Sequence, residues 1–167
     1  MTLTIKALSI DDGFDIYQML QEIPADENGF LNSAFGKDYA AYQAWLQSAA
    51  ANARQQDIVD GWKVPQSTYW LFADETPVGY GKIRHFLTDK LKESGGHLGY
   101  SIRPAFRQKG YGTQFLGLLV EESRKLGIEE IYLTIRSENI ASIKTALANN
   151  ARILKVTEQR HYLAIYP

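Results

Sequence analysis

A glycine-rich turn between a strand and a helix is the feature that most constrains this chain. The turn, Arg107-Gln108-Lys109-Gly110-Tyr111-Gly112, follows a strand-like run at 97–102 and precedes a helix-like run at 113–126. Such a turn directs unpaired backbone N–H groups and the positive end of the helix toward one point, which favours an anion. Both glycines lack a Cβ and allow close approach, while the arginine and the lysine add positive charge. The spacing therefore predicts a site for a phosphate or pyrophosphate group.

The composition limits the classes of protein to which this chain can belong. A length of 167 residues, 45% of them hydrophobic, fits one folded domain spanning residues 1–167. The formal net charge of −1 provides no global basic field for nucleic acid or for an anionic membrane. The absence of cysteine excludes disulfides, thiolate metal sites and a cysteine nucleophile.

The N-terminal run bears on the location of the protein, and the spacing of its histidines bears on metal binding. The run Met1–Lys6 reads as a strand and lacks the apolar core of a signal peptide, and no run approaches about 20 apolar residues. We therefore expect a soluble cytoplasmic protein, a monomer or homodimer that binds neither nucleic acid nor membrane. The three histidines, His85, His97 and His161, are not at metal-ligand spacing with the acidic residues, so we expect no metal site.

The order of elements predicts an α/β (α+β) fold with a mixed sheet. Antiparallel hairpins flank a central strand–helix–strand unit, which would place the glycine-rich turn near the middle of the sheet, where ligands commonly bind beyond the strand ends. Residues 24–36 are polar and punctuated by glycine, which predicts a loop, as does the charged connection at 88–96. The predicted strands are 3–8, 68–73, 78–84, 97–102, 130–135, 152–157 and 160–165, and the predicted helices begin after Ser9 or Asp11 and cover 39–54, 113–126 and 140–149.

Three kinds of phosphate-binding turn compete for the glycine-rich segment. A nucleoside-triphosphate loop requires Gly-x-x-x-x-Gly-Lys-Ser/Thr, which no segment supplies. A dinucleotide-binding turn requires a third glycine, but the corresponding residue is Phe115, and that turn belongs to the first strand–helix unit of a parallel sheet. The remaining pattern, Arg/Gln-x-x-Gly-x-Gly/Ala after a strand, is the best match.

This pattern resembles the acyl-CoA signature of the GCN5-related N-acetyltransferase (GNAT) superfamily. Three blocks carry the resemblance in order: Gly99-Tyr100-Ser101-Ile102-Arg103-Pro104, then 107–112, then Ser137-Glu138-Asn139-Ile140-Ala141-Ser142. The segment from Gly95 to Pro104 and the ending Arg160-His161-Tyr162 also resemble a bacterial subgroup of predicted acetyltransferases. The likeness extends from about Val78 to Val156.

The resemblance implies a GNAT-like, largely antiparallel central sheet of about seven strands flanked by helices, in which the strand at 97–102 splays from the strand at 130–135. The pantetheine arm of acetyl-CoA would lie in that gap, and its pyrophosphate would meet the N–H groups of 108–113. The resemblance assigns the binding of acetyl-CoA to Ile102, Arg103, Pro104, Arg107, Gln108, Lys109, Gly110, Tyr111, Gly112, Thr113, Asn139 and Ser142.

The same resemblance implies direct transfer of the acetyl group to an amine, without a covalent enzyme intermediate. Many relatives place a tyrosine seven residues after the equivalent of Asn139 as the general acid, but this chain has Ala146 there. Tyrosines on predicted strands are alternatives, as is proton transfer to solvent. We name His97, which relays the amine proton directly or through water, as the leading catalytic residue. The alternative tyrosines are Tyr80, Tyr100, Tyr132 and Tyr162.

The acceptor is expected to be a small-molecule amine or a peptide amino group. Its pocket is expected between the N-terminal helices and the loop at 24–36, where Glu22, Asp26 and Glu27 are acidic. Two other functions stay open: an acyl-CoA-binding or regulatory module without turnover, and a dinucleotide enzyme. Binding of CoA, thiol release with amines and binding of NAD would separate the three.

Overall fold

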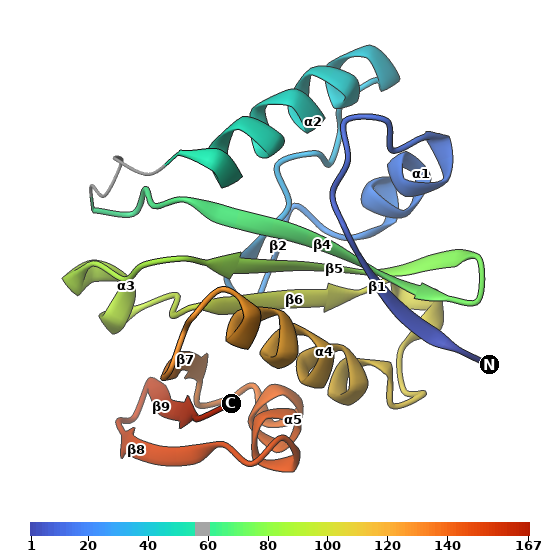
Figure 1. Cartoon of the computed structure of the whole chain (residues 1–167). Coiled ribbons are helices and arrows are strands. Elements are labelled where there is room, and N and C mark those ends of the chain that lie inside the picture. Colours follow the sequence, from blue (N-terminus) through green and yellow to red (C-terminus); the bar gives the residue numbers. More distant parts are fainter. Residues whose placement is uncertain (56–60) are drawn as a thin grey trace.

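The computed structural model describes residues 1–55 and 61–167, and its strands form two main sheets and a short hairpin (Figure 1). Neighbouring strands within each sheet pair in the antiparallel sense. The first sheet has the order β1 (Leu3–Ala7), β4 (Gln66–Ala73), β5 (Thr76–Arg84), β6 (Leu98–Ile102). The second has the order β7 (Ile131–Arg136), β9 (Arg160–Ile165), β8 (Arg152–Val156).

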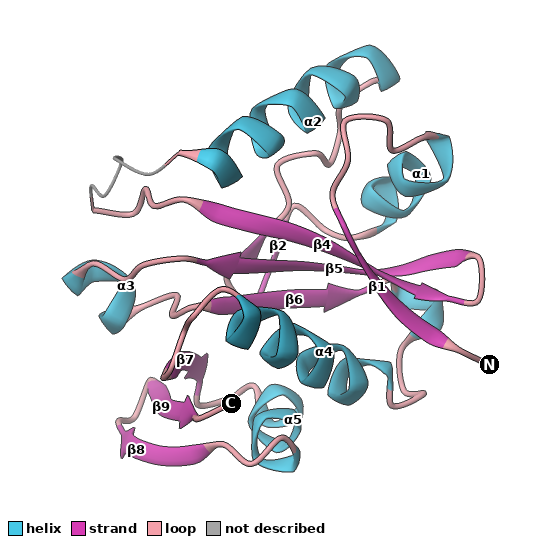
Figure 2. Ribbon diagram, viewed as in Figure 1, coloured by secondary structure: helices cyan, strands magenta, loops and turns pink. Residues whose placement is uncertain are grey.

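Helices cover both faces of the first sheet (Figure 2). Helices α1 (Phe14–Glu22) and α2 (Tyr39–Arg54) lie on one face, and α4 (Tyr111–Lys125) lies on the other. Helix α5 (Ile140–Ala148) lies next to α4 and joins β7 to β8. The expected α/β architecture, with largely antiparallel strands and flanking helices, is confirmed. In the described residues, none of the helices has the length and apolar character needed to cross a membrane.

The alternation of side chains along β5 explains why the sheet is covered on both faces. Tyr80 points to the side of α1 and α2, where it joins Trp70 and Tyr42 in a buried aromatic cluster. Gly81 is on the opposite side, where an added Cβ would lie 2.8 Å from the ring of Phe115 on α4. Helix α4 is therefore held close to the sheet, and its N-terminus is fixed beside the end of β6.

The expectation that Ser9 or Asp11 caps the first helix is wrong. The residue before α1 is Gly13, and no side chain caps the helix. Asp12 instead accepts hydrogen bonds from the indole N–H of Trp70 at 2.7 Å and from the backbone N–H of Ser9 at 2.7 Å. It also lies 3.1 Å from Lys6 Nζ, so the buried charge is paired and fully hydrogen-bonded.

The hairpin β2 (Asp26–Glu27) and β3 (Phe30–Leu31) lies inside the segment predicted as a loop. Its turn is Asn28-Gly29, and both residues have positive φ, 53° and 88°. Asn-Gly is the preferred pair for a two-residue hairpin turn of this kind, so the signal was present in the sequence. A short helix, α3 (Asp89–Glu93), likewise lies within the predicted connection at 88–96, capped by the Thr88 hydroxyl.

Strands β6 and β7 belong to different sheets, and the hydrogen bonds found between their segments in the described residues lie where β6 begins. The His97 N–H donates to the Tyr132 carbonyl at 2.8 Å, and the Gly95 N–H donates to Thr134 Oγ1 at 2.8 Å. Gly96 has φ of 66°, and a Cβ there would lie 2.5 Å from the Tyr132 carbonyl oxygen, so glycine is required for this approach. Beyond this point the two strands diverge and leave a gap between them, as the resemblance implied.

Candidate functional site

The glycine-rich turn presents a row of unpaired backbone N–H groups. Gln108 and Gly110 have positive φ, 62° and 81°, and Gly110 is the residue that precedes α4. No acceptor is found among the described residues for the N–H groups of residues 108–113, because the first intrahelical bond is donated by Gln114. The backbone N–H groups that the sequence predicts for an anion site, here called the cradle, therefore lie together at the positive end of a 15-residue helix.

The cradle opens into a cavity of about 880 Å³ that extends along the gap between β6 and β7. Its walls are β6, the start of α4, β7 and α5 on one side, and β5 with the β2–β3 hairpin on the other. The volume is in the range of cavities that bind cofactors and small molecules. One continuous cavity thus reaches from the anion cradle to the sheet face that carries the hairpin.

The structure brings most of the residues assigned to acetyl-CoA into this cavity. The exceptions are Arg103, Pro104 and Lys109, which do not line it. Arg103 instead extends toward α1, where its Nε donates to Glu22 at 3.0 Å and its second terminal nitrogen also meets that carboxylate. The assigned residues that do line the cavity are Ile102, Arg107, Gln108, Gly110, Tyr111, Gly112, Thr113, Asn139 and Ser142.

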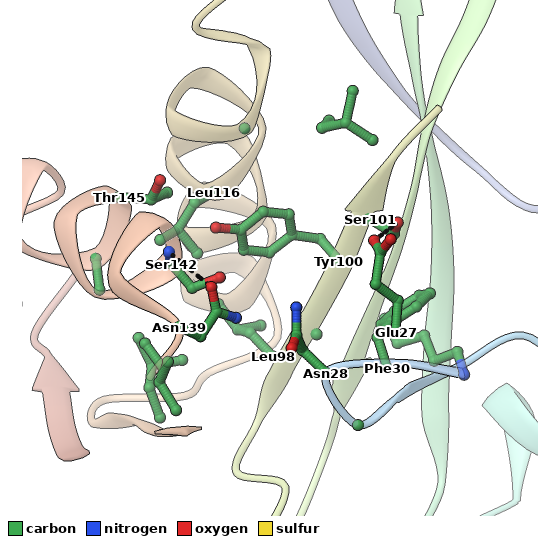
Figure 3. Close-up of a pocket in the computed structure, with 18 of the residues that line it drawn as sticks. Glu27, Asn28, Phe30, Leu98, Tyr100, Ser101, Leu116, Asn139, Ser142 and Thr145 are labelled. Carbon is green, nitrogen blue, oxygen red and sulfur yellow. Dashed lines mark hydrogen bonds between the residues drawn. The ribbon is translucent and has the colours of Figure 1, made fainter. Parts of the chain in front are cut away.

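The side chain of Arg107 is held away from the cradle by an ion pair. Its Nη1 and Nη2 donate to the two carboxylate oxygens of Glu27 at 2.9 and 2.7 Å, and its Nε donates to the Ile102 carbonyl at 2.8 Å. Glu27 is on β2 and faces Ser101 of β6 (Figure 3). Glu22 and Glu27, two of the acidic residues at the expected acceptor pocket, are thus both paired with arginines, and the Glu27 pair joins the hairpin to the turn.

Asn139 lies at the start of α5 on the opposite wall of the gap. Its Oδ1 accepts a hydrogen bond from the Ser142 N–H at 3.4 Å, so it caps the helix. Both residues also line the cavity, so capping is compatible with contact to a ligand. Figure 3 shows the two side chains at the edge of the gap, facing the strand that carries Tyr100.

Tyr100 crosses from β6 toward α5 (Figure 3). Its ring packs edge-on against Phe115, with the ring centroids 6.1 Å apart, and its hydroxyl group points to the hydroxyls of Ser142 and Thr145. Burial raises the pKa of Tyr100 above its usual value, and these two hydroxyls oppose that rise only in part. The phenol is therefore protonated at neutral pH. Thr145 directly precedes the buried Ala146, which also lines the cavity.

The other tyrosines proposed from the sequence do not line this cavity. Tyr80 is enclosed in the aromatic cluster beneath α2, with only 2% of its surface exposed. Tyr132 and Tyr162 pack against each other, with ring centroids 6.2 Å apart, and the Tyr162 hydroxyl donates to the Glu93 carbonyl. Only the position of Tyr100, among the four candidates, allows a direct role at the gap.

His97 lies outside the cavity, which corrects the expectation that it handles protons there. Its Nδ1 accepts a hydrogen bond from the Tyr132 N–H at 2.9 Å, at the closed end of the gap. Its side chain borders a separate cleft with Leu126, Ile128 and Tyr132. The imidazole thus takes the place of a strand carbonyl and joins β6 to β7.

The lowered pKa of His97 makes the contact between β6 and β7 sensitive to acidic pH. Burial, together with the charges of Arg84 and Lys92, lowers the pKa of His97 to about 4. Between this value and about 6.5 the unfolded chain binds a proton that the folded chain does not, so the free energy of unfolding falls as the pH is lowered through that window.

We expect a His97→Asn variant, which keeps an acceptor but cannot titrate, to lose this part of the pH dependence. Urea midpoints at pH 7.5 and pH 5 measure it, because the wild-type midpoint should fall more than that of the variant. Equal falls in the two proteins would contradict the assignment.

The acidic and basic side chains determine whether the described residues could hold a metal ion and which charge the cavity carries. Within residues 1–55 and 61–167, no three His, Asp or Glu side chains lie close enough together to hold a metal ion. Glu27 is the only carboxylate that lines the described part of the cavity, whereas five cationic side chains do so. These are Lys82, Arg84, Arg107, Arg136 and Arg160.

A comparison with known families agrees with this geometry. The acetyltransferase (GNAT) family model matches residues 26–148, which include the hairpin, the gap, the cradle and α5. The chain belongs to the GNAT acetyltransferase family. No curated protein matches the sequence. The GNAT assignment places the cradle and the gap in the part of the chain that the family shares.

Solved structures show the same GNAT fold at low identity. An acetyltransferase of the GNAT family from Streptococcus pneumoniae is 14% identical, with a TM-score of 0.65 and coverage of 99% of this chain and 100% of that chain. The N-acetyltransferase PseH of Campylobacter jejuni, solved with acetyl coenzyme A, is 11% identical, with a TM-score of 0.64 and coverage of 99% of both chains. RimL, a ribosomal L7/L12 alpha-N-protein acetyltransferase, is 14% identical, with a TM-score of 0.66 and coverage of 99% and 91%.

Proposed function

We propose that this chain transfers the acetyl group of acetyl-CoA to a primary amine, within a ternary complex and as one domain of residues 1–167. The row of free N–H groups at 108–113, opening into the same cavity as the β6–β7 gap, carries this proposal. The cradle fits a diphosphate, since two glycines leave its surface open and α4 presents its positive end there. The family membership and the neighbours that are N-acetyltransferases support the choice of an amine.

Acetyl-CoA supplies a thioester whose carbonyl carbon accepts the amine nitrogen. A charged amine first gives up one proton to a base; then the C–N bond forms, the C–S bond breaks, the nitrogen loses its second proton and the departing sulfur gains one. The first proton must leave because a lysine-type amine has a pKa of about 10.4 and is mostly charged at neutral pH. The chain therefore needs one group that accepts a proton on the hairpin side and one that donates on the α5 side.

We assign the donating role to Tyr100 and the accepting role to Glu27. Tyr100 is protonated and lines the gap, and its hydroxyl group meets Thr145, the residue before Ala146, where the usual tyrosine is missing. Glu27 is on the opposite wall, hydrogen-bonded at 3.4 Å to Ser101 of β6. The Tyr100 side chain leaves β6 toward α5, and Glu27 reaches β6 from the other side (Figure 3), as proton donation and acceptance on the two sides of a reacting carbonyl require.

We expect a Glu27→Gln variant to lower kcat by about 10²-fold, the usual contribution of a positioned base. The affinity for CoA should not fall, because loss of the carboxylate leaves Arg107 with its charge beside the cradle. Steady-state kinetics and calorimetric titration with CoA measure the two quantities separately. A weaker Kd with unchanged kcat would show that Glu27 only positions Arg107.

The function is tested by titration with acetyl-CoA and by release of free thiol with a panel of primary amines, both small molecules and peptide N-termini. Binding of acetyl-CoA and amine-dependent thiol release support the proposal. Binding without thiol release for any amine would identify a CoA-binding module without turnover. Binding of NAD in preference to CoA would overturn the assignment of the cradle.

A further inference from the structure

The sheet face beneath the hairpin carries two cations that the proposed transfer chemistry does not use. Lys82 and Arg84 are two residues apart on β5, so their side chains share one face, the same face as Tyr80. Both line the cavity, beyond the segment of β6 that leads to the cradle. These two side chains form what we call the β5 cation pair.

No carboxylate in the described residues forms a salt bridge with either member of the β5 cation pair. Lys82 Nζ donates one hydrogen bond, to the Leu31 carbonyl on β3, and lies 4.8 Å from the ring centroid of Phe30. Arg84 Nη1 donates to the Gly96 carbonyl at 2.9 Å. Their other N–H donors have no protein acceptor in the described part of the chain, and each side chain is half-buried.

Holding these two cations together without an anion is unfavourable. Burial, and then the charge of Arg84, lower the pKa of Lys82 to about 8, and burial lowers the pKa of Arg84. Enclosed charges are normally paired, because loss of water is costly without a compensating partner. An anion placed between the two would recover that cost and would use the free donors, which a guanidinium and an ammonium offer to carboxylate or phosphate.

The pairing of strands separates the β5 cation pair from the diphosphate cradle. Lys82 is opposite Gly99 on β6, and the Arg84 N–H donates to the His97 carbonyl. At about 3.3 Å per residue, these positions are about 10 and 17 Å from Ile102, and the cradle begins five residues further on. The β5 cation pair therefore faces the acceptor end of the cavity, under the hairpin.

We propose that the β5 cation pair binds an anionic group of the acceptor, so that the acetylated amine belongs to a molecule that also bears a carboxylate or a phosphate. This inference rests on the proposed acetyl transfer and adds the class of acceptor. Phe30 and Trp62, which line the same end of the cavity, provide apolar surface for the rest of such a molecule. A free amino acid and a phosphorylated small amine are the two sources of this chemistry.

Matched acceptors test the proposal. Each amino acid is compared with its amide, and phosphoethanolamine with ethanolamine, by kcat/KM for thiol release. A neighbouring carboxylate raises the pKa of the amine and so leaves less of it uncharged. A preference for the acid therefore cannot come from the basicity of the amine.

For at least one matched pair, we expect kcat/KM of the anionic acceptor to exceed that of its neutral partner by about 10-fold or more. Lys82→Gln and Arg84→Gln should reduce that ratio by raising KM for the anionic acceptor. Lys125→Gln, which removes one charge at the far end of α4, is the control and should leave the ratio as in the wild type. Equal rates for all matched pairs would overturn the inference while the proposed function stands.

A binding measurement covers the case in which no amine of the panel is acetylated. N-acetylated amino acids and their amides are titrated into the protein saturated with CoA. Binding of an acid in preference to its amide, weakened by Lys82→Gln, supports the inference even if turnover fails. Absence of binding by every anionic compound, or equal binding of acid and amide, contradicts it. Failure of CoA itself to bind would contradict the proposed function first.

Discussion

A Gly112→Asp substitution is expected to abolish measurable binding of acetyl-CoA while leaving the fold intact. Gly112 is in the first turn of α4 and lines the cavity, and an added Cβ would lie 3.6 Å from the ring of Tyr100, an ordinary contact. An aspartate there would occupy the region that the diphosphate needs. Two like charges at 4 Å interact by about 4 kcal/mol near a protein surface, which corresponds to roughly a 10³-fold loss of affinity.

The same substitution should not destabilise the protein. An acidic side chain in the first turn of a helix is favourable by about 0.3–1 kcal/mol, and removal of glycine adds helix propensity. Calorimetric titration with CoA and a thermal melt check the two statements. Gly112→Asn is the matched control, of equal size but uncharged, and should lose much less affinity. Equal losses for both variants would show that shape, and not charge, excludes the ligand.

Tyr100→Phe is expected to lower kcat by about 10²-fold or more, the usual contribution of a positioned acid. Phenylalanine keeps the packing against Phe115 and removes only the hydroxyl group near Ser142 and Thr145. The affinity for CoA should therefore change little. Because burial raises the pKa of Tyr100, wild-type kcat should fall only at strongly alkaline pH, and this fall should be absent in the variant.

The pH–rate profile separates a catalytic role from a packing role for Tyr100. Tyr162→Phe removes a hydroxyl that donates to the Glu93 carbonyl outside the cavity, and it should retain the wild-type kcat. If Tyr100→Phe retained kcat and the alkaline fall, the proton on the departing sulfur would have to come from solvent. The thiolate is a tolerable leaving group near neutral pH, so that outcome is chemically consistent.

Local patterns were enough to predict the elements that position the cradle. The strand before Arg103 and the helix after Gly110 both depend on short-range alternation and on the turn between them. The covered faces of α2 and α4 follow from their helical periodicity. The hairpin at Asn28-Gly29 was missed because its strands are only two residues each, too short for a periodic signal.

The contacts that complete the site join residues far apart in sequence, and these could not be predicted from local patterns. Glu27 and Arg107 are 80 residues apart, and nothing near either residue indicates its partner. His97 was expected in the cavity as the residue that relays the amine proton. Its side chain instead replaces a strand carbonyl in bonding Tyr132, a choice that depends on where β7 lies. The enclosure of Lys82 and Arg84 likewise follows only from the position of the hairpin.

The ion pair between Glu27 and Arg107 affects which segments of this chain can be exchanged with those of relatives in a chimera. The hairpin arises from the N-terminal part of the chain and the cradle from the later part, and this pair, with the Ser101 contact, connects the two across the cavity. A chimera that exchanges residues 26–31 alone would thus replace one cavity wall while retaining the turn at 107–112. If the exchanged segment keeps an acidic residue at position 27, acceptor preference can diverge among such chimeras without redesign of the donor site.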